Sequence, residues 1–135
     1  MTTLRRRLRE DRGSASTQLV LVTPALLVLA LLIVQLALTW HARHIAQYAA
    51  QRGLAAARVE DGSAADGSAQ ARRSLAALGG RVLTGPSVQV ARTSAYTTVR
   101  VDGSVIAVVP GLHLHASGTA AGATEKVTFP TGAQP

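Results

Sequence analysis

The most prominent feature of the hydrophobic pattern is an uninterrupted apolar run near the N-terminus. Leu19 to Trp40 is a stretch of 22 residues without a charged side chain. As an α-helix it would be about 33 Å long, enough for a bilayer hydrocarbon core of about 30 Å. Trp40 stands at its far end, where an amphipathic ring suits the headgroup level. The pattern therefore predicts a transmembrane helix over residues 19–40.

The helical pattern does not stop at Trp40. Residues 41–58 are rich in helix formers and contain a single interior glycine, so we expect one helix from about Ser16 to about Arg58. Such a helix would be about 65 Å long. A single-pass anchor needs no helix of this length.

Small and hydrogen-bonding side chains recur along this helix at spacings of three and four, which places them on one stripe. Small residues let helices approach closely in lipid and just outside it. Because half of residues 42–57 are Ala or Gly, chance also produces such a stripe, and both interpretations stay open. The stripe consists of Gln35, Thr39, Ala42, Ala46, Ala49, Gly53 and Ala56.

Pro24 lies inside the apolar run, where it removes one backbone hydrogen bond and presses on the carbonyl of Val20. In a bilayer this defect is tolerated where neighbouring helices or hydroxyls satisfy the backbone again, and Thr23 is adjacent. Two consequences stay open. Pro24 either gives an anchor a mild kink or lets the helix unwind locally when it packs among others of its kind.

Beyond Arg58 the pattern predicts a small α+β domain. Residues 60–69, EDGSAADGSA, are a polar connector rich in Gly and Ser. A short helix follows, and we expect Ser68 as its N-cap and Gly79–Gly80 as its end. Its apolar face consists of Ala71, Leu75 and Leu78.

After Gly80 the period changes to two, which is typical of strands. Asp102–Gly103 is either a type I′ hairpin turn or a kink within one long strand. A further strand starts at Leu112, after Pro110–Gly111, and residues 125–129 are a candidate edge strand. The alternating positions are Val88, Val90, Val99, Val101, Val105, Ala107 and Val109, then Leu112, Leu114 and Ala116. Together they predict a three- or four-stranded antiparallel sheet packed on part of the helices.

The expected fold is therefore α+β: a long N-terminal transmembrane helix that extends outside the membrane, then a short helix and a small antiparallel sheet. The expected divisions are a basic leader over 1–13, the long helix over 14–58, a linker over 59–69, an extracytoplasmic domain over 70–130 and a flexible tail over 131–135.

The net charge of +7 is concentrated beside the apolar run. Five arginines precede the run within residues 1–13, three lie in 41–58, and the last 77 residues are nearly balanced. This asymmetry favours an N-terminus in the cytoplasm and a C-terminal part outside. Because aromatic residues make up only 3% of the chain, base-stacking side chains are scarce, and we expect no nucleic acid as a partner.

A secretory signal peptide is the competing interpretation of the N-terminus. The apolar region of such a peptide has about 7–15 residues, which is shorter than the run found here. The small-residue site Ala55–Ala57 also lies well beyond the end of the run. The pattern favours a retained membrane segment.

The sequence carries little that indicates catalysis or metal binding. There is no cysteine, which excludes disulfides, thiolate metal sites and thiol catalysis. No nucleophile elbow, P-loop or dinucleotide fingerprint occurs. Two histidine pairs have spacings that can bind a metal but lack a third ligand nearby in sequence; they are His41 with His44 and His113 with His115. We expect no enzyme activity, metal or cofactor.

The start of the apolar run carries a more specific pattern. In DRGSASTQLVLVTP, residues 11–24, a basic leader ends in Gly13, a small residue follows at Ser14, and Thr23–Pro24 lies in the next helix. This stretch resembles a type IV prepilin leader and, more narrowly, that of the TadE-like minor pseudopilins of tight-adherence (Flp-type) pili. Similarity in pattern extends to V-x-V-x-G at 99–103 and PGL at 110–112.

The resemblance implies a processing event and a set of partners. A membrane aspartic prepilin peptidase would cut after Gly13 and leave Ser14 as the new N-terminus. Since glycine has no side chain, it suits a peptidase that must approach the backbone there. The mature helix would stay in the bacterial inner membrane until it joins a pilus, or supports its assembly, with other pilin subunits and the assembly machinery.

One position departs from the family pattern. At the fifth residue after the expected cut, the family and its relatives usually carry glutamate, whose charge can pair with the free amine of a neighbouring subunit. Here the residue is Gln18, which hydrogen-bonds but cannot neutralise an ammonium group. We therefore expect a minor or initiating subunit. The alternative is an unprocessed, signal-anchored extracytoplasmic binding or sensing protein, which has no need of Gly13.

Overall fold

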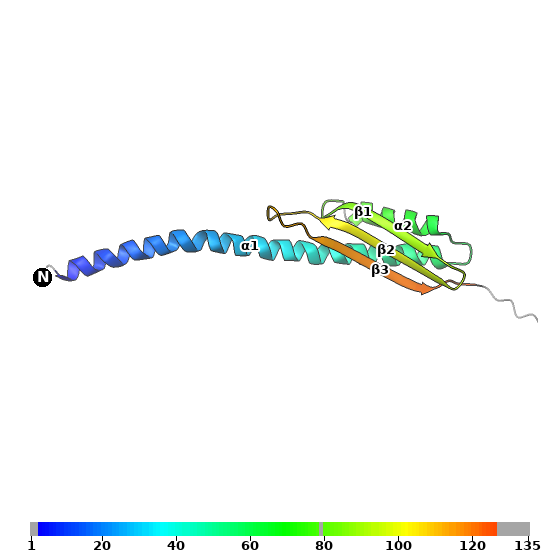
Figure 1. Cartoon of the computed structure of the whole chain (residues 1–135), viewed down its shortest axis with the longest axis horizontal. Coiled ribbons are helices and arrows are strands. Elements are labelled where there is room, and N and C mark those ends of the chain that lie inside the picture. Colours follow the sequence, from blue (N-terminus) through cyan, green and yellow to red (C-terminus); the bar gives the residue numbers. More distant parts are fainter. Residues whose placement is uncertain (1–2, 79, 127–135) are drawn as a thin grey trace, which may run out of the picture.

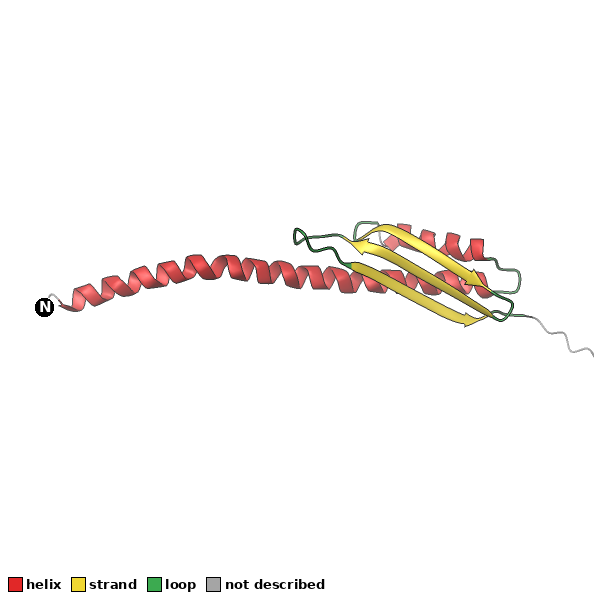
Figure 2. Cartoon of the chain, viewed as in Figure 1, coloured by secondary structure: helices red, strands yellow, loops and turns green. Residues whose placement is uncertain are grey.

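The computed structural model describes residues 3–78 and 80–126 (Figure 1). Two helices come first along the chain and three strands follow (Figure 2). The elements are α1 (Thr3–Arg58), α2 (Ala64–Leu78), β1 (Leu83–Arg92), β2 (Tyr96–Val105) and β3 (His115–Ala123). This order confirms the expected α+β fold with a long N-terminal helix, a short helix and an antiparallel sheet.

The helix α1 is a single element of 56 residues, and its N-terminal half extends far beyond the rest of the molecule (Figure 1). It runs through Trp40 without interruption and ends at Arg58, the predicted end. It begins at Thr3, well before the expected start near Ser16. The physical reason is local propensity, because residues 4–9 are leucine and arginine, which are good helix formers.

The C-terminal end of α1 is held by a residue of β1 and by one that follows β3. The N–H of Glu125 donates to the carbonyl oxygen of Arg58 (2.8 Å). Nη2 of Arg92 donates to the carbonyl oxygens of Val59 (3.1 Å) and Glu60 (3.3 Å). The last carbonyls of a helix have no partner within it, so these bonds satisfy the helix end and fix the chain that leads to α2.

The second helix begins inside the segment expected to be a connector. Its N-cap is Ser63: Oγ of Ser63 accepts a hydrogen bond from the N–H of Asp66 (3.1 Å), and Oδ2 of Asp66 accepts one from the N–H of Ser63 (3.0 Å). This reciprocal pair is a capping box with aspartate in the third helical position. The prediction of Ser68 as N-cap was wrong, because the third residue after Ser68 is Ala71, which cannot return the bond.

The three strands form an antiparallel sheet in the order β1-β2-β3. The central strand β2 continues through Asp102–Gly103, since Asp102 pairs with Ser87 of β1 and with Ser117 of β3. The Asp-Gly pair therefore belongs to one long strand and is not a hairpin turn. The irregularity lies in β1, where the register shifts between Thr84 and Ser87.

The boundaries expected around residue 110 were wrong. β2 ends at Val105 and β3 begins at His115, so residues 106–114 form a loop. Gly111 has a φ of 82° and lets this loop turn sharply after Pro110. The expected strand positions Ala107, Val109, Leu112 and Leu114 belong to the loop. Of the candidate edge strand, residues 127–129 lie outside the described residues and 125–126 are not in a strand.

Both helices pack against the same face of the sheet (Figure 2). α1 contacts mainly β3 and β2, whereas α2 contacts β1 and lies beside α1. Alternate residues of β2 and β3 face the helices and are buried, as the period-two pattern predicts. The core is built mostly from small residues: Ala42, Ile45, Ala46, Ala49, Ala50, Ala71, Leu75, Leu83, Val99, Val101, Val105, Ala116 and Ala120.

Candidate functional site

The first candidate feature is the half of α1 that no part of the described chain covers. Every residue from Gln18 to Val34 is exposed, and this half of the helix projects alone from the domain (Figure 1). The helix is long and apolar enough to cross a membrane, and only 6% of its most apolar 18-residue window is buried. Contiguous apolar surface of this extent marks a contact with a membrane or a protein. The chain thus fits a single-pass membrane protein.

The second feature is the stripe of small residues, whose partner lies within the chain. The sheet, α2 and the loop over 106–114 cover it. The spacing predicts a packing surface, and the structure uses these positions to pack the chain's own domain against α1. A helix face that carries mainly small side chains can pack against a strand as well as against another helix. The sequence alone therefore does not say which of the two covers the stripe. Of the stripe, Gln35, Thr39, Ala42, Ala46, Ala49 and Gly53 are buried, and Ala56 is half-buried.

Gln35 ties α1 to the loop over 106–114. The side chain is fully buried. Its Nε2 donates to the carbonyl oxygen of Ile106 (3.2 Å), while its Oε1 accepts from the N–H groups of Val108 (2.7 Å) and Val109 (3.4 Å). The hydroxyl of Thr39 donates to the backbone carbonyl of Gln35 (2.8 Å). The carboxamide of Gln35 thus takes the place of a backbone peptide for the loop.

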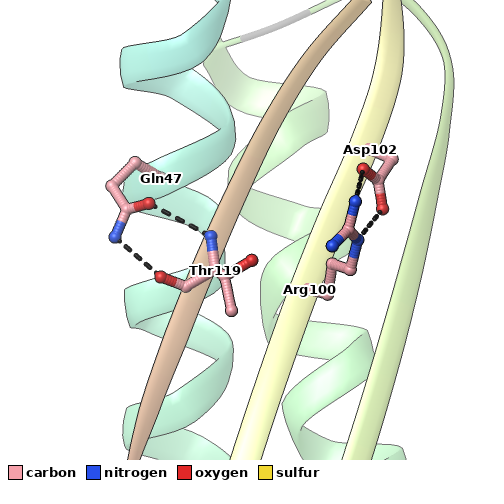
Figure 3. A network of polar contacts seen from close by, with 4 residues as sticks. All are labelled: Gln47, Arg100, Asp102 and Thr119. Atoms are coloured by element: carbon pink, nitrogen blue, oxygen red, sulfur yellow. Dashed lines mark hydrogen bonds and ion pairs between the residues drawn. The ribbon is translucent and has the colours of Figure 1, made fainter.

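Gln47 makes a second contact of the same kind, with β3 (Figure 3). Its Nε2 donates to the carbonyl oxygen of Thr119 (3.0 Å), and its Oε1 accepts from the N–H of Thr119 (3.1 Å). On the sheet face away from the helices, Arg100 and Asp102 form a bidentate ion pair with an Nε–Oδ2 distance of 2.7 Å. Gln47 was not identified from the sequence, because it lies outside the stripe. Its only signal in the sequence is a side-chain amide that can bond to a backbone peptide.

Glycines allow the elements to meet at two points along α1. A methyl group at Gly118 of β3 would overlap the backbone of Ala46 and Gln47. A methyl group at Gly53 would lie 2.9 Å from the carbonyl oxygen of Gly67, so α1 and α2 touch backbone to backbone there. At Gly53, one position of the stripe, α1 and α2 of this chain approach closely. Packing of the stripe against helices of other subunits stays a prediction.

The expected processing residues Gly13 and Ser14 lie within α1. The N–H and carbonyl groups of helical peptides are engaged in hydrogen bonds along the helix, so a peptidase needs local unwinding at this bond. A glycine inside a helix weakens it by about 1 kcal/mol relative to alanine. Unwinding α1 at Gly13 therefore costs less than it would at an alanine in the same place. Gln18 follows one turn later and is exposed at the start of the bare segment.

Pro24 lies in a helix that continues on both sides of it. The hydroxyl of Thr23 donates to the carbonyl oxygen of Leu19 (2.7 Å). The carbonyl freed by Pro24 is that of Val20. The Thr23 hydroxyl bonds to the carbonyl of Leu19 and therefore does not replace the hydrogen bond that Val20 loses. Both consequences drawn from Pro24 in the sequence remain predictions.

The four histidines are exposed. His44 lies beside Trp40, with ring centroids 5.3 Å apart. Within residues 3–78 and 80–126, no three His, Asp or Glu side chains gather into a metal-binding group. An open hollow between α2 and β1 is lined by Arg72, Leu75, Ala76, Gly80, Leu83, Thr84, Gly85 and Pro86. These residues provide no acid or base with which to activate the one hydroxyl among them.

The comparison with known families agrees with the sequence pattern of the helix. Residues 13–54 match the family described as "TadE-like protein", which confirms the resemblance over that segment. The match starts at Gly13 and ends next to Gly53, where α1 meets α2. No curated protein matches the chain. No solved structure matches it either.

Proposed function

We propose that this chain, whose α1 matches the TadE-like family, is a minor pseudopilin that takes part in assembling a tight-adherence (Flp-type) pilus. In this proposal it is a non-enzymatic protein of the bacterial inner membrane, with its N-terminus in the cytoplasm and its domain outside. Its partners are other pilin subunits, the assembly machinery, the prepilin peptidase and membrane lipid. Its biological setting is adhesion and the secretion machinery that builds pili.

The observation that carries the proposal is the division of α1 into a covered and a bare half. From Gln35 to Ala57 the stripe face is filled by the chain's own domain, whereas from Gln18 to Val34 the helix is exposed all round. A bare apolar helix can exchange lipid contacts for contacts with similar helices. This division supports a subunit that first resides in the membrane and later packs with other helices.

Processing after Gly13 is supported by two independent observations. The family match begins at Gly13, and a glycine beside the bond lowers the cost of unwinding the helix there relative to alanine. A cut there removes all five arginines that precede the apolar run. The mature chain then starts at Ser14 and has no charged side chain from Ser14 to Trp40.

Gln18 supports a minor or initiating position. It lies four residues after Ser14, the position where the family usually carries the glutamate that pairs with a neighbouring amine, yet its amide cannot neutralise an ammonium group. Burying that group without an opposite charge is strongly unfavourable. A subunit at a filament tip, or one that works in the membrane, avoids this burial.

A photo-crosslinking residue at Leu27 tests the proposal in cells that make the pilus proteins and the peptidase. Leu27 is exposed in the bare half, so we expect an adduct with a second pilin subunit. The matched controls are the same residue at Gln89, on β1, and the Leu27 probe combined with Gly13→Leu. If Leu27 gives only lipid adducts whether or not Gly13 is replaced, the chain is an unprocessed anchor and the proposal fails.

A further inference from the structure

The loop over residues 106–114, here called the apolar loop, lies at the depth of the membrane helix. It reaches past the end of the sheet toward the bare half of α1 (Figure 1), and Val108 and Val109 are bonded to the side chain of Gln35. Gln35 precedes Trp40 by five residues, which is about 7.5 Å along a helix axis. With Trp40 at the headgroup level, as the sequence predicts, the loop would lie deeper than this tryptophan.

The length of the exposed segment from Leu19 to Val34 gives the same position of the loop relative to the membrane. Leu19 to Val34 spans 16 residues, or about 24 Å of helix, and a hydrocarbon core is about 30 Å thick. A core that starts at Leu19 therefore ends near Thr39, beyond Gln35. The apolar loop and its contact with Gln35 fall inside that limit.

The composition of the loop suits lipid. No Asp, Glu, Lys or Arg occurs between Asp102 and Glu125. Residues 105–112 read VIAVVPGL, without a polar side chain, and His113 is the first titratable residue after them. Ile106 and Val108 are 44% and 36% exposed, so large apolar side chains point away from the domain. Charged residues are several kcal/mol less favourable at the bilayer centre than leucine or valine, and the loop avoids them.

Part of the loop backbone already has hydrogen-bond partners within the protein, which suits a medium without water. Non-helical backbone at membrane depth is tolerated only where its polar groups are satisfied by protein or water. The amide of Gln35 serves three of these groups, and backbone bonds serve others. These are Ile106 N–H to the Val82 carbonyl (3.0 Å), Leu112 N–H to the Val109 carbonyl (3.2 Å) and Val105 N–H to the Leu114 carbonyl (2.8 Å).

We propose that the apolar loop inserts into the membrane leaflet on the domain's side and forms a second lipid contact beside α1. Gln35 favours this insertion by replacing water at three backbone groups of the loop. Two attachment points fix the rotation of the domain about α1 relative to the membrane plane. The inference rests on the proposed membrane location of the bare half, so its test includes a separate probe of that half.

The absence of cysteine allows single labels on the full chain. Val108→Cys, Leu27→Cys and Ser94→Cys each receive the environment-sensitive fluorophore NBD, and the proteins are placed in phosphatidylcholine–phosphatidylglycerol vesicles. Ser94 is exposed at the opposite end of the sheet. Quenching is measured with a nitroxide on the lipid acyl chain and with iodide in the water. Circular dichroism checks that the three labelled proteins keep the same helix content.

We expect the lipid nitroxide to quench the Val108 label severalfold more than the Ser94 label, and iodide to quench it severalfold less. If the Val108 label is quenched to the same extent as the Ser94 label while the Leu27 label is quenched by the lipid nitroxide, the loop does not insert. The membrane location of α1 is then still supported. If Leu27 is not quenched by lipid, the membrane location itself fails. If Val108 is shielded from both quenchers, protein covers the loop, and the assignment of lipid is overturned.

Discussion

Gln47 and Thr119 are joined by two hydrogen bonds that reproduce the pairing of neighbouring strands, although Gln47 belongs to a helix. β3 is at one edge of the sheet, and an edge strand presents unpaired N–H and carbonyl groups to other chains. The carboxamide of Gln47 occupies such groups at the middle of β3. The same α1 helix thus covers the inner face of the sheet and blocks part of its edge.

Replacing Gln47 with leucine tests this role. We expect Gln47→Leu to lower the free energy of unfolding by about 1–2 kcal/mol, since two hydrogen bonds are lost, and to increase self-association through β3. Denaturant unfolding and sedimentation of the full chain in detergent measure the two effects. Gln51→Leu, exposed one turn later on α1, is the control. Equal stability of the two variants would refute the role of Gln47.

Gly118 is predicted to be the most restrictive position of β3. A methyl group there overlaps the α1 backbone at Ala46 and Gln47, and overpacking of this kind destabilises by about 1–3 kcal/mol. Gly118→Ala should therefore lower the thermal unfolding midpoint of the full chain in detergent.

Gly122→Ala is the matched control on the same strand. Its added methyl group meets Leu54 at 3.6 Å, an ordinary contact, and glycine in a strand interior is unfavourable relative to alanine. We expect this variant to unfold at or slightly above the temperature of the unmodified chain. A similar loss in both variants would show that α1 and β3 do not approach as closely as described.

Gln35 should control the order of the apolar loop. Gln35→Leu leaves the N–H groups of Val108 and Val109 without their acceptor, a loss of about 1–3 kcal/mol for buried groups. We expect faster amide hydrogen exchange over 106–109 and unchanged exchange in α2. Gln89→Leu, exposed on β1, should leave both regions unchanged. Unaltered exchange over 106–109 in Gln35→Leu would contradict the contact.

The cap of α2 predicts a pH dependence. Hydrogen bonds from the side chain and the N–H of Ser63 lower the pKa of Asp66 below its ordinary value of 3.8. A group whose pKa falls on folding stabilises the fold above its unfolded pKa, and this contribution is lost as the pH falls through the folded pKa. Amide exchange at the start of α2 should therefore accelerate as the pH falls below 3.8, after correction for intrinsic rates.

Asp66→Asn is the control for that pH dependence, because its side chain still accepts hydrogen bonds but does not titrate. We expect the corrected exchange at the start of α2 to be independent of pH in this variant. An NMR titration that places the pKa of Asp66 at or above 3.8 would contradict the cap.

The sequence was sufficient to predict the fold class, the end of α1 and the inward-facing valines of β2, because each depends on local periodicity. The sequence was insufficient where one pattern of residues can pack against two different partners. The stripe from Gln35 to Gly53 accepts a helix of another subunit or this chain's own sheet, and only the tertiary structure selects the sheet. The same limit applies to Ser63 and Ser68, which stand in similar local sequences; the reciprocal bond with Asp66 distinguishes them.

The central claim is that Gly13–Ser14 is a processing site, and the intact mass of the protein tests it most directly. The full chain is expressed with and without a prepilin peptidase, and Gly13→Leu and Gln18→Glu are compared with the unmodified sequence. With the peptidase, the account predicts loss of residues 1–13 from the unmodified chain and from Gln18→Glu, and no cleavage of Gly13→Leu. An unchanged mass in all three would contradict it.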